Sequence, residues 1–166
     1  MLNILLKNIL PVLFAVPVFF SCTSSKKTTG SVSRDELKGT WQLDNITYEG
    51  LPQSQKVKLT LLDEGTETCL KGSTWVLPNN GNGSYTIGSN EPGCIAGQRN
   101  IVWSYRVEND QPIFQYKRLP GGVKAADVTE GYKFNIVDAT GESFKIRSNV
   151  NFEGNTISIS YLFSKK

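Results

Sequence analysis

Apolar and polar residues alternate along most of the chain after residue 40. The clearest case is residues 101–107, where Ile101, Trp103 and Tyr105 share one parity and polar residues occupy much of the other. Because successive side chains of a strand point to opposite faces, this period of two predicts a strand with one buried face. Similar patterns predict further strands at residues 40–48, 57–62, 73–77, 84–88, 112–119, 132–136, 144–152 and 157–163.

Turn sequences separate the predicted strands. The strongest is residues 78–83, Pro-Asn-Asn-Gly-Asn-Gly, which lies between two apolar runs and is typical of a hairpin. A change of parity at Asp44 and Asn45 predicts a bulge in the first strand. A short helical turn is expected at residues 34–38, and residues 120–130 read as a loop that covers the end of the fold.

Eight or nine short strands without a long helix favour an all-β fold. A small antiparallel up-and-down β-barrel over residues 34–166 would leave no strand edge exposed. With 166 residues, the chain has room for one such domain with its own core.

The first 33 residues have the features of a targeting signal followed by a flexible linker. Residues 1–21 contain an apolar run that is too short to span a bilayer and suits a signal peptide. The run ends in Phe19-Phe20-Ser21-Cys22, which resembles a bacterial lipobox, in which the cysteine becomes lipidated, for example with palmitate. Residues 22–33 are small and polar and would form a flexible tether to the outer membrane, with the domain facing the periplasm. The alternative is an ordinary secretory signal in which Cys22 occurs by chance.

Cys69 and Cys94 are the two remaining cysteines. In an oxidising compartment, such a pair is most simply a disulfide. The alternative is two free or redox-active thiols, although no Cys-x-x-Cys spacing supports it.

Charge and composition argue against several functions. The net charge is +3, and the basic residues are scattered rather than gathered in a stripe, so nucleic-acid binding is not expected. The chain has no histidine, which removes the commonest general base, and we expect neither an enzyme nor a cofactor nor a metal site. Asp63, Glu64 and Glu67 could bind a cation, but their spacing favours a solvated loop, and no acidic residue has an obvious inward parity.

Gly39 and Trp41 open the first predicted strand. A glycine permits close approach at the end of a barrel, and a tryptophan one alternation later can close that end with an apolar ring. The Gly-x-Trp pair resembles the opening motif of the lipocalin family, and the whole chain resembles the divergent lipocalin-like lipoproteins of Bacteroidetes-type outer membranes. The resemblance implies an eight-stranded barrel that binds small, mostly apolar ligands. It also implies a late-strand arginine stacked on the tryptophan, but Arg147 has the parity of the solvent face.

Aromatic residues of inward parity would fill the barrel or line a ligand cavity. An eight-stranded barrel is just wide enough for either arrangement. The candidates are Trp75, Tyr85, Trp103, Tyr105, Phe114, Tyr116, Phe134 and Tyr161. The favoured function is therefore binding of a small apolar or amphipathic ligand by a membrane-anchored barrel. The alternative is a filled barrel that acts through its loops as a protein-interaction or inhibitor module. The sequence leaves the oligomeric state open.

Overall fold

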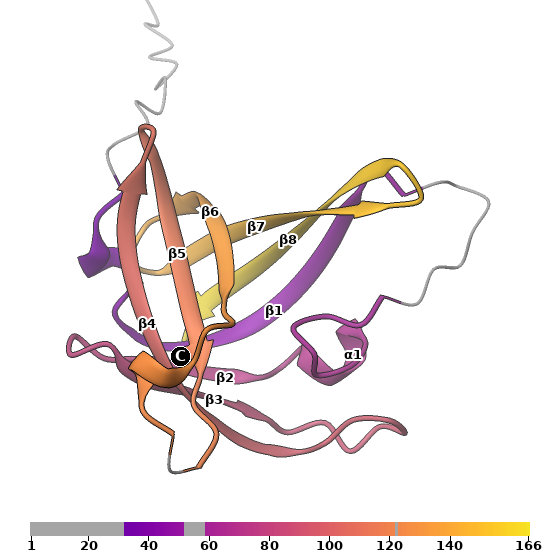
Figure 1. Ribbon diagram of the computed structural model, residues 1–166, viewed down its shortest axis with the longest axis horizontal. Helices are drawn as coiled ribbons and strands as arrows, with labels where there is room; N and C mark the ends of the chain where they lie inside the picture. Colours follow the sequence, from indigo (N-terminus) through magenta and orange to yellow (C-terminus); the bar gives the residue numbers. More distant parts are fainter. Residues whose placement is uncertain (1–31, 52–58, 122) are drawn as a thin grey trace, which may run out of the picture.

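The computed structural model describes residues 32–51, 59–121 and 123–166. The predicted signal peptide (1–21), Cys22 and the tether up to residue 31 lie outside the described residues. The described residues form a closed barrel of eight strands, whose arrangement is drawn in Figure 1. The strands are β1 (Gly39–Glu49), β2 (Thr74–Leu77), β3 (Asn82–Ile87), β4 (Gly97–Glu108), β5 (Gln111–Arg118), β6 (Tyr132–Ala139), β7 (Ser143–Phe152) and β8 (Asn155–Lys165).

Each strand pairs antiparallel with the next strand in the chain, and β8 pairs with β1 to close the barrel. The predicted all-β up-and-down barrel is therefore confirmed. The ladders differ in length: β7 and β8 pair from Ser143↔Ser164 to Phe152↔Asn155, whereas β2 and β3 pair only from Thr74↔Thr86 to Val76↔Ser84. The long β7–β8 hairpin and the end of β1 project together beyond the rest of the barrel, at the right of Figure 1.

Inward side chains form one hydrophobic core. The predicted bulge is confirmed, because the pairing of β1 with β8 shifts register between Leu43 and Asn45. The shift lets Leu43 and Ile46 both point inward although their parities differ, and both are buried. The core and the closed ladder both lie within the described part of residues 32–166.

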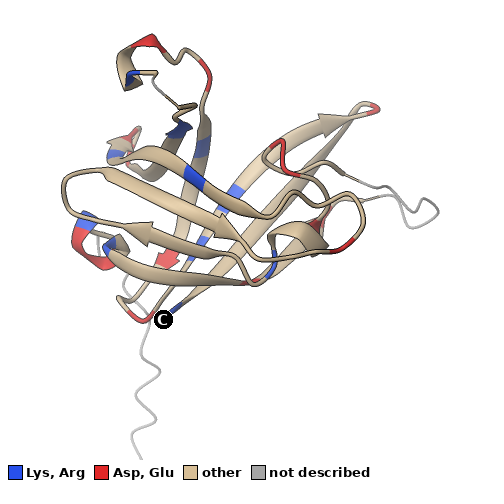
Figure 2. Ribbon diagram, turned by 90° about the horizontal axis from the view of Figure 1, so that it is seen from below, with Lys and Arg blue, Asp and Glu red and all other residues tan. Residues whose placement is uncertain are grey.

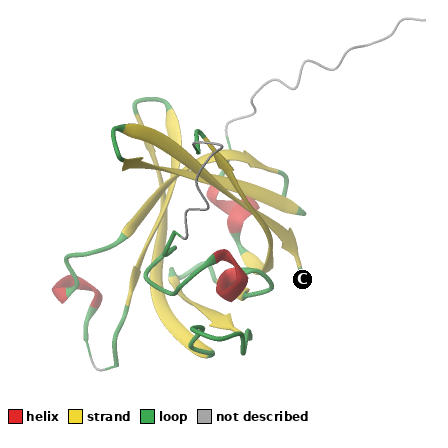
Figure 3. Cartoon of the chain, turned by 90° about the vertical axis from the view of Figure 1, so that its right-hand side faces the viewer, coloured by secondary structure: helices red, strands yellow, loops and turns green. Residues whose placement is uncertain are grey.

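Short helical segments lie before the first strand and in two of the connections, and Figure 3 shows them in red. They are the 3-10 helices η1 (Arg34–Leu37) and η2 (Ala125–Asp127) and the single-turn helix α1 (Glu67–Leu70). The helical turn predicted at residues 34–38 is thus present, and Ser33 forms a capping box with Glu36 at its start. Among the described residues, no helix has the length and apolar content needed to cross a membrane.

The strand predicted at residues 57–62 is absent from the part that the structure describes. Residues 52–58 lie outside the described residues, and Leu61 forms a single bridge with Gly65. The backbone turns back on itself here, because Leu62 and Asp63 both have left-handed conformations, with φ of 52° and 54°. Of the residues of this apolar alternation that the structure describes, Leu61 is buried in the core and Leu59 packs against it, but neither belongs to a strand of the sheet.

The barrel has two different ends. The closed end holds η1, the β4–β5 and β6–β7 turns and the chain terminus; the open end holds the β1–β2, β3–β4 and β5–β6 connections and the β7–β8 turn. Charged residues are dispersed over the strands and connections in Figure 2, without a continuous basic stripe across the ribbon.

Candidate functional site

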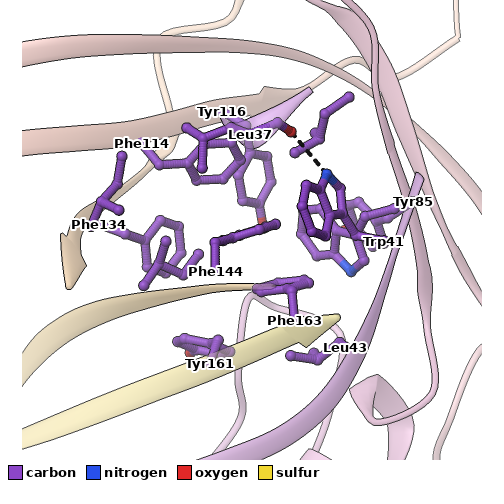
Figure 4. Close-up of a cluster of buried hydrophobic side chains, with 14 of the residues drawn as sticks. Leu37, Trp41, Leu43, Tyr85, Phe114, Tyr116, Phe134, Phe144, Tyr161 and Phe163 are labelled. Carbon is purple, nitrogen blue, oxygen red and sulfur yellow. Dashed lines mark hydrogen bonds between the residues drawn. The ribbon is translucent and has the colours of Figure 1, made fainter. Parts of the chain in front are cut away.

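Trp41 fills the closed end of the barrel. Its side chain is fully buried, and its indole N–H donates a hydrogen bond of 2.8 Å to the carbonyl of Leu37, drawn as the dashed line in Figure 4. Phe144 packs edge-on against the indole, with ring centroids 4.8 Å apart. Every polar group of this tryptophan is therefore satisfied, and the predicted role of Trp41 in closing the barrel agrees with its position.

Lys165 takes the place expected for a late-strand arginine. Its ammonium lies 4.3 Å from the centre of the Trp41 ring and donates a 2.8 Å hydrogen bond to the carbonyl of Lys38. Gly39 makes room for it, because a Cβ at this position would lie 2.6 Å from the Lys165 ammonium nitrogen. The glycine thus admits a side chain rather than a neighbouring backbone. Arg147 lies on the outer wall, where it contacts Ser160 and Glu49, as its parity indicated.

The aromatic candidates pack on one another through most of the barrel interior (Figure 4). Seven of them have no more than 3% of their surface exposed: Trp75, Tyr85, Trp103, Phe114, Tyr116, Phe134 and Tyr161. Trp75 stacks on Tyr85 at 4.5 Å and meets Phe163 edge-on at 5.6 Å. These contacts fill the barrel below the open end with side chains.

Tyr105 differs from the other candidates. It is only partly buried, and its hydroxyl donates a hydrogen bond of 2.5 Å to the carbonyl of Val32, the first described residue. This contact ties the start of the described chain to β4 near the closed end. Tyr105 therefore lies near the closed end, away from the predicted cavity residues at the open end.

A pocket of about 260 Å³ lies inside the open end, against β6, β7 and β8. Its apolar lining comes from these strands and from the connection after β1: Leu61, Leu62, Phe134, Val150 and Ile159. Its hydroxyl groups come from Thr60, Tyr132, Ser148 and Tyr161. Burial raises the pKa of Tyr161 to about 12, against the opposing effect of a hydrogen bond with Ser148, so this phenol is neutral at physiological pH. We call this hollow the open-end pocket.

Tyr116 carries an unpartnered polar group, and its ring packs against Tyr132, which lines this pocket. Its ring stacks on that of Tyr132 at 4.8 Å, and burial raises the pKa of its phenol well above the ordinary value, with further contributions from Tyr85, Tyr132 and Tyr161. Its hydroxyl is buried and has no hydrogen-bond partner among the described residues. A buried hydroxyl without a partner costs free energy, and such groups occur mainly where they serve a function.

Glu64 also points into the open end, which corrects two expectations. Its side chain is only 4% exposed, so it belongs to no solvated acidic loop, and it is an inward carboxylate. Arg118 donates to Oε1 over 2.7 Å, and the Tyr85 hydroxyl donates to the same oxygen over 2.6 Å. Arg99 donates through Nη2 to Oε2 over 2.8 Å, and through Nε to both oxygens. We call Glu64, Arg99, Arg118 and Tyr85 the Glu64 cluster.

The ionisation of Glu64 follows from these contacts. Burial opposes it, but the hydrogen bonds from Arg99, Tyr85 and Arg118 outweigh burial and hold the pKa of the carboxyl below its ordinary value. Strand parity contained the signal for this cluster: Arg99 shares the parity of Ile101, and Arg118 shares that of Tyr116. Two inward arginines in one barrel require a buried anion.

The connection that carries Glu64 is fastened by the predicted disulfide. Cys69 and Cys94 are bonded, which links the β1–β2 connection to the β3–β4 connection across the open end. Residues 61–65, which we call the open-end hairpin, are held further by Tyr132, whose hydroxyl bonds the Leu62 carbonyl and the Asp63 carboxylate. Within the described part of the chain, no group of three or more His, Cys, Asp or Glu side chains is arranged to hold a metal ion.

The closed barrel, the buried Trp41 and the pocket at the opposite end agree with one family. The model of the lipocalin-like domain matches residues 37–146, which is more than half of the chain. The chain belongs to the lipocalin-like domain family. No curated protein and no solved structure matches the chain significantly. The lipocalin-like barrel is suited to ligand binding in general. Strand β8, with the Lys165 that lies over Trp41, follows the matched residues.

Proposed function

We propose that this lipocalin-like protein is a lipid-anchored envelope protein that binds a small apolar or amphipathic molecule. The observation that carries the proposal is the open-end pocket, which combines an apolar lining with hydroxyl groups at one end of an otherwise filled barrel. Apolar walls with a few oriented polar groups are the usual composition of a small-molecule site.

The size of the pocket limits the ligand. Its volume of about 260 Å³ is just below the range of roughly 300–1,000 Å³ that is common for ligand sites. The rings of Phe134 and Tyr161, 5.5 Å apart and edge to face, form part of its inner boundary. A short chain or a single ring system therefore fits better than a large lipid.

The position of the N-terminal side supports the anchored arrangement. The described chain begins at Val32, beside Tyr105 and the closed end, so a tether from Cys22 would enter there. The pocket lies at the opposite end and would face away from the membrane surface. Incorporation of labelled palmitate into the full chain, and its loss in Cys22→Ser, would test the anchor. Equal labelling of both chains would rule it out.

The ligand-binding proposal is tested by native mass spectrometry of residues 23–166 purified from the host envelope. An added mass that disappears on denaturation is expected. Val150→Trp should fill the pocket and reduce binding of a fluorescent fatty acid at least about tenfold, since Val150 lines it. The matched control is Val137→Trp, because Val137 is similarly exposed (43% against 38%) but is not part of this pocket. Equal losses in both variants would contradict the assignment of the site.

A second candidate function is a protein-interaction or inhibitor module that acts through its loops. The observation that favours it is Ile95, which is 72% exposed in the connection next to the disulfide-bonded Cys94. Apolar side chains presented on constrained loops are common in binding surfaces. A bare mass in the native spectrum together with no uptake of fatty acids would favour this candidate over the first.

A further inference from the structure

The Glu64 cluster has an excess of positive charge inside the barrel wall. Two guanidinium groups, of Arg99 and Arg118, share the single carboxylate of Glu64. Tyr85 is neutral, because burial and then its hydrogen bond to Glu64 raise the pKa of the phenol. Arg118 is 36% exposed and also lines a hollow of about 340 Å³ with Gln98, Arg99 and Asn100, in which no lining residue is acidic. The cluster is therefore a cationic site that a carboxylate already occupies.

The geometry of the cluster is that of carboxylate recognition. Arg99 engages both oxygens of Glu64, while Arg118 and Tyr85 converge on Oε1. Planar guanidinium donors match the plane of a carboxylate, and charge-assisted hydrogen bonds are the stronger kind. These donors stand on β3, β4 and β5, so the barrel wall holds them in place.

Glu64 itself does not belong to the barrel wall. It lies in the open-end hairpin, whose two sides are paired by one isolated bridge between Leu61 and Gly65. Leu62 and Asp63 at its turn are both left-handed, and a leucine is poorly suited to that conformation. The β4–β5 turn has the same backbone with Asn109 and Asp110, which tolerate it. The carboxylate is thus carried by a strained element on the edge of the site.

The hairpin also stands between the cluster and the open-end pocket. Leu61 and Leu62 line that pocket, and Asp63 lines a second hollow of about 550 Å³ that includes Arg118, Glu130 and Tyr132. A shift of the hairpin would therefore connect the apolar pocket to the two arginines.

We propose that Arg99, Arg118 and Tyr85 bind the carboxylate of an amphipathic ligand, and that Glu64 occupies their site when this ligand is absent. The proposal rests on the proposed function, since the apolar part of the ligand would lie in the open-end pocket. Exchange of one carboxylate for another preserves the charge-assisted hydrogen bonds of the barrel wall, and the displaced Glu64 gains hydration. The unpartnered Tyr116 hydroxyl is a further buried donor, and its ring stacks on Tyr132, which lines the open-end pocket.

The internal carboxylate should act as a competitor of the ligand. Removing it should strengthen binding, whereas removing an arginine should weaken it. A residue with only a structural role would show the opposite for Glu64, because breaking a buried ion pair destabilises the site. The direction of the Glu64 effect on affinity therefore separates the two roles.

The experiment is calorimetric titration of residues 23–166 with octanoate and with octanol, which have the same chain length. Octanoate should bind at least about tenfold more tightly than octanol. Glu64→Ala should raise the affinity for octanoate about tenfold, and Glu64→Gln, a smaller change that keeps the side-chain volume, should raise it less. Arg118→Gln should abolish the preference for octanoate. Arg147→Gln is the matched control, since it removes an arginine that pairs with Glu49 on the outer wall.

The outcomes distinguish this proposal from the proposed function. If octanoate and octanol bind with equal affinity and the Glu64 variants change neither affinity, the proposed recognition of the carboxylate is overturned. The proposal that the open-end pocket binds a small molecule then still stands. If neither compound binds to any folded form, both proposals fail. Thermal unfolding provides a second measurement: acetate should stabilise Glu64→Ala in a saturable manner and leave Glu64→Gln unaffected. Absence of this rescue in a folded Glu64→Ala protein would also contradict the proposal.

Discussion

The closed and open ends of this barrel are built on opposite principles. At the closed end, Trp41 is buried with its N–H bonded to Leu37, and Lys165 covers the ring while bonding a backbone carbonyl. At the open end, the structure buries the Glu64 carboxylate among two arginines and leaves the Tyr116 hydroxyl without a partner among the described residues. At the closed end, Trp41 and Lys165 bond carbonyls of nearby residues, although Arg34 Nε is buried there without a partner among the described residues. At the open end, the Glu64 carboxylate is satisfied only by donors from several strands.

This difference indicates that the closed end contributes mainly to stability and that the open end serves a function. A well-packed indole with a satisfied N–H contributes to folding at little electrostatic cost. A buried ion pair often contributes no more stability than apolar residues of similar volume, so its presence calls for another reason. Strained backbone at Leu62 and Asp63 lies at the same end. The buried ion pair, the unpartnered Tyr116 hydroxyl and the strained turn thus lie at the end that holds the pocket.

The largest effect is expected from Trp41→Ala, which breaks the closed end. Loss of a fully buried tryptophan should lower the free energy of unfolding by about 3–5 kcal/mol, measured by urea denaturation. Trp41→Phe keeps a ring and loses only part of this energy. The affinity for ligand in the protein that remains folded should be unchanged, because the pocket lies at the other end. A loss below about 1 kcal/mol would contradict the role of Trp41.

Much of the closed end could be predicted from the sequence. Alternation identified the inward residues, and the parity change at Asp44 identified the bulge, because each strand reports its own two faces. The cation over Trp41 is a lysine, whereas the family resemblance implies an arginine at this place. Lys165 shares the inward parity of Phe163 and could have been considered.

The open end was harder to predict because its contacts join residues far apart in the chain. Glu64 meets Arg99 and Arg118 from 35 and 54 positions away, and the short acidic segment around it has the composition of an exposed loop. The turn at Leu62 and Asp63 lacks the Asn or Gly that usually marks such a backbone. Local patterns report faces and turns, whereas this site depends on which loop enters the barrel.

The next largest effect is expected from the double variant Cys69→Ala and Cys94→Ala. Opening a loop of 25 residues should lower the free energy of unfolding by about 3–4 kcal/mol by the chain-entropy estimate. Without the cross-link, the open end should in addition open locally. Hydrogen exchange should therefore accelerate more at the backbone N–H of Glu64, which bonds the Leu61 carbonyl, than at the Trp41 indole N–H, which is expected to exchange through global unfolding. Equal acceleration at both ends would show that the two ends do not open separately.

A smaller and pH-dependent effect is expected from Glu64→Gln. The pKa of the Glu64 carboxyl is held below 4.5 in the folded protein. Its contribution to the free energy of unfolding is therefore fully present above the pKa that this carboxyl has in the unfolded chain, and it is lost as the pH falls through the pKa of the folded state. Near neutral pH, the variant should be less stable by about 2–3 kcal/mol, and the difference should shrink below pH 4.5. Urea unfolding over a pH series measures this.

The matched control is Glu49→Gln, which loses an exposed pair with Arg147 at 3.4 Å. It should change the free energy of unfolding by less than about 1 kcal/mol. If the two variants lose the same stability, burial of Glu64 has no special energetic consequence. A difference that grows on acidification would reverse the sign assigned to the carboxyl.

The smallest effect on stability is expected from Tyr116→Phe, and it contrasts with the effect of Tyr85→Phe at the same end of the barrel. Removing a buried hydroxyl that has no partner among the described residues should leave the free energy of unfolding unchanged or raise it by up to about 1 kcal/mol. Tyr85→Phe removes a hydroxyl that bonds the Glu64 carboxylate and should cost about 1.5–3 kcal/mol. Tyr116→Phe should lower the affinity for octanoate more than the affinity for octanol, because the hydroxyl would donate a hydrogen bond to the polar group of the ligand. A stable Tyr116→Phe protein with unaltered affinity for both compounds would show that this hydroxyl has no part in the site.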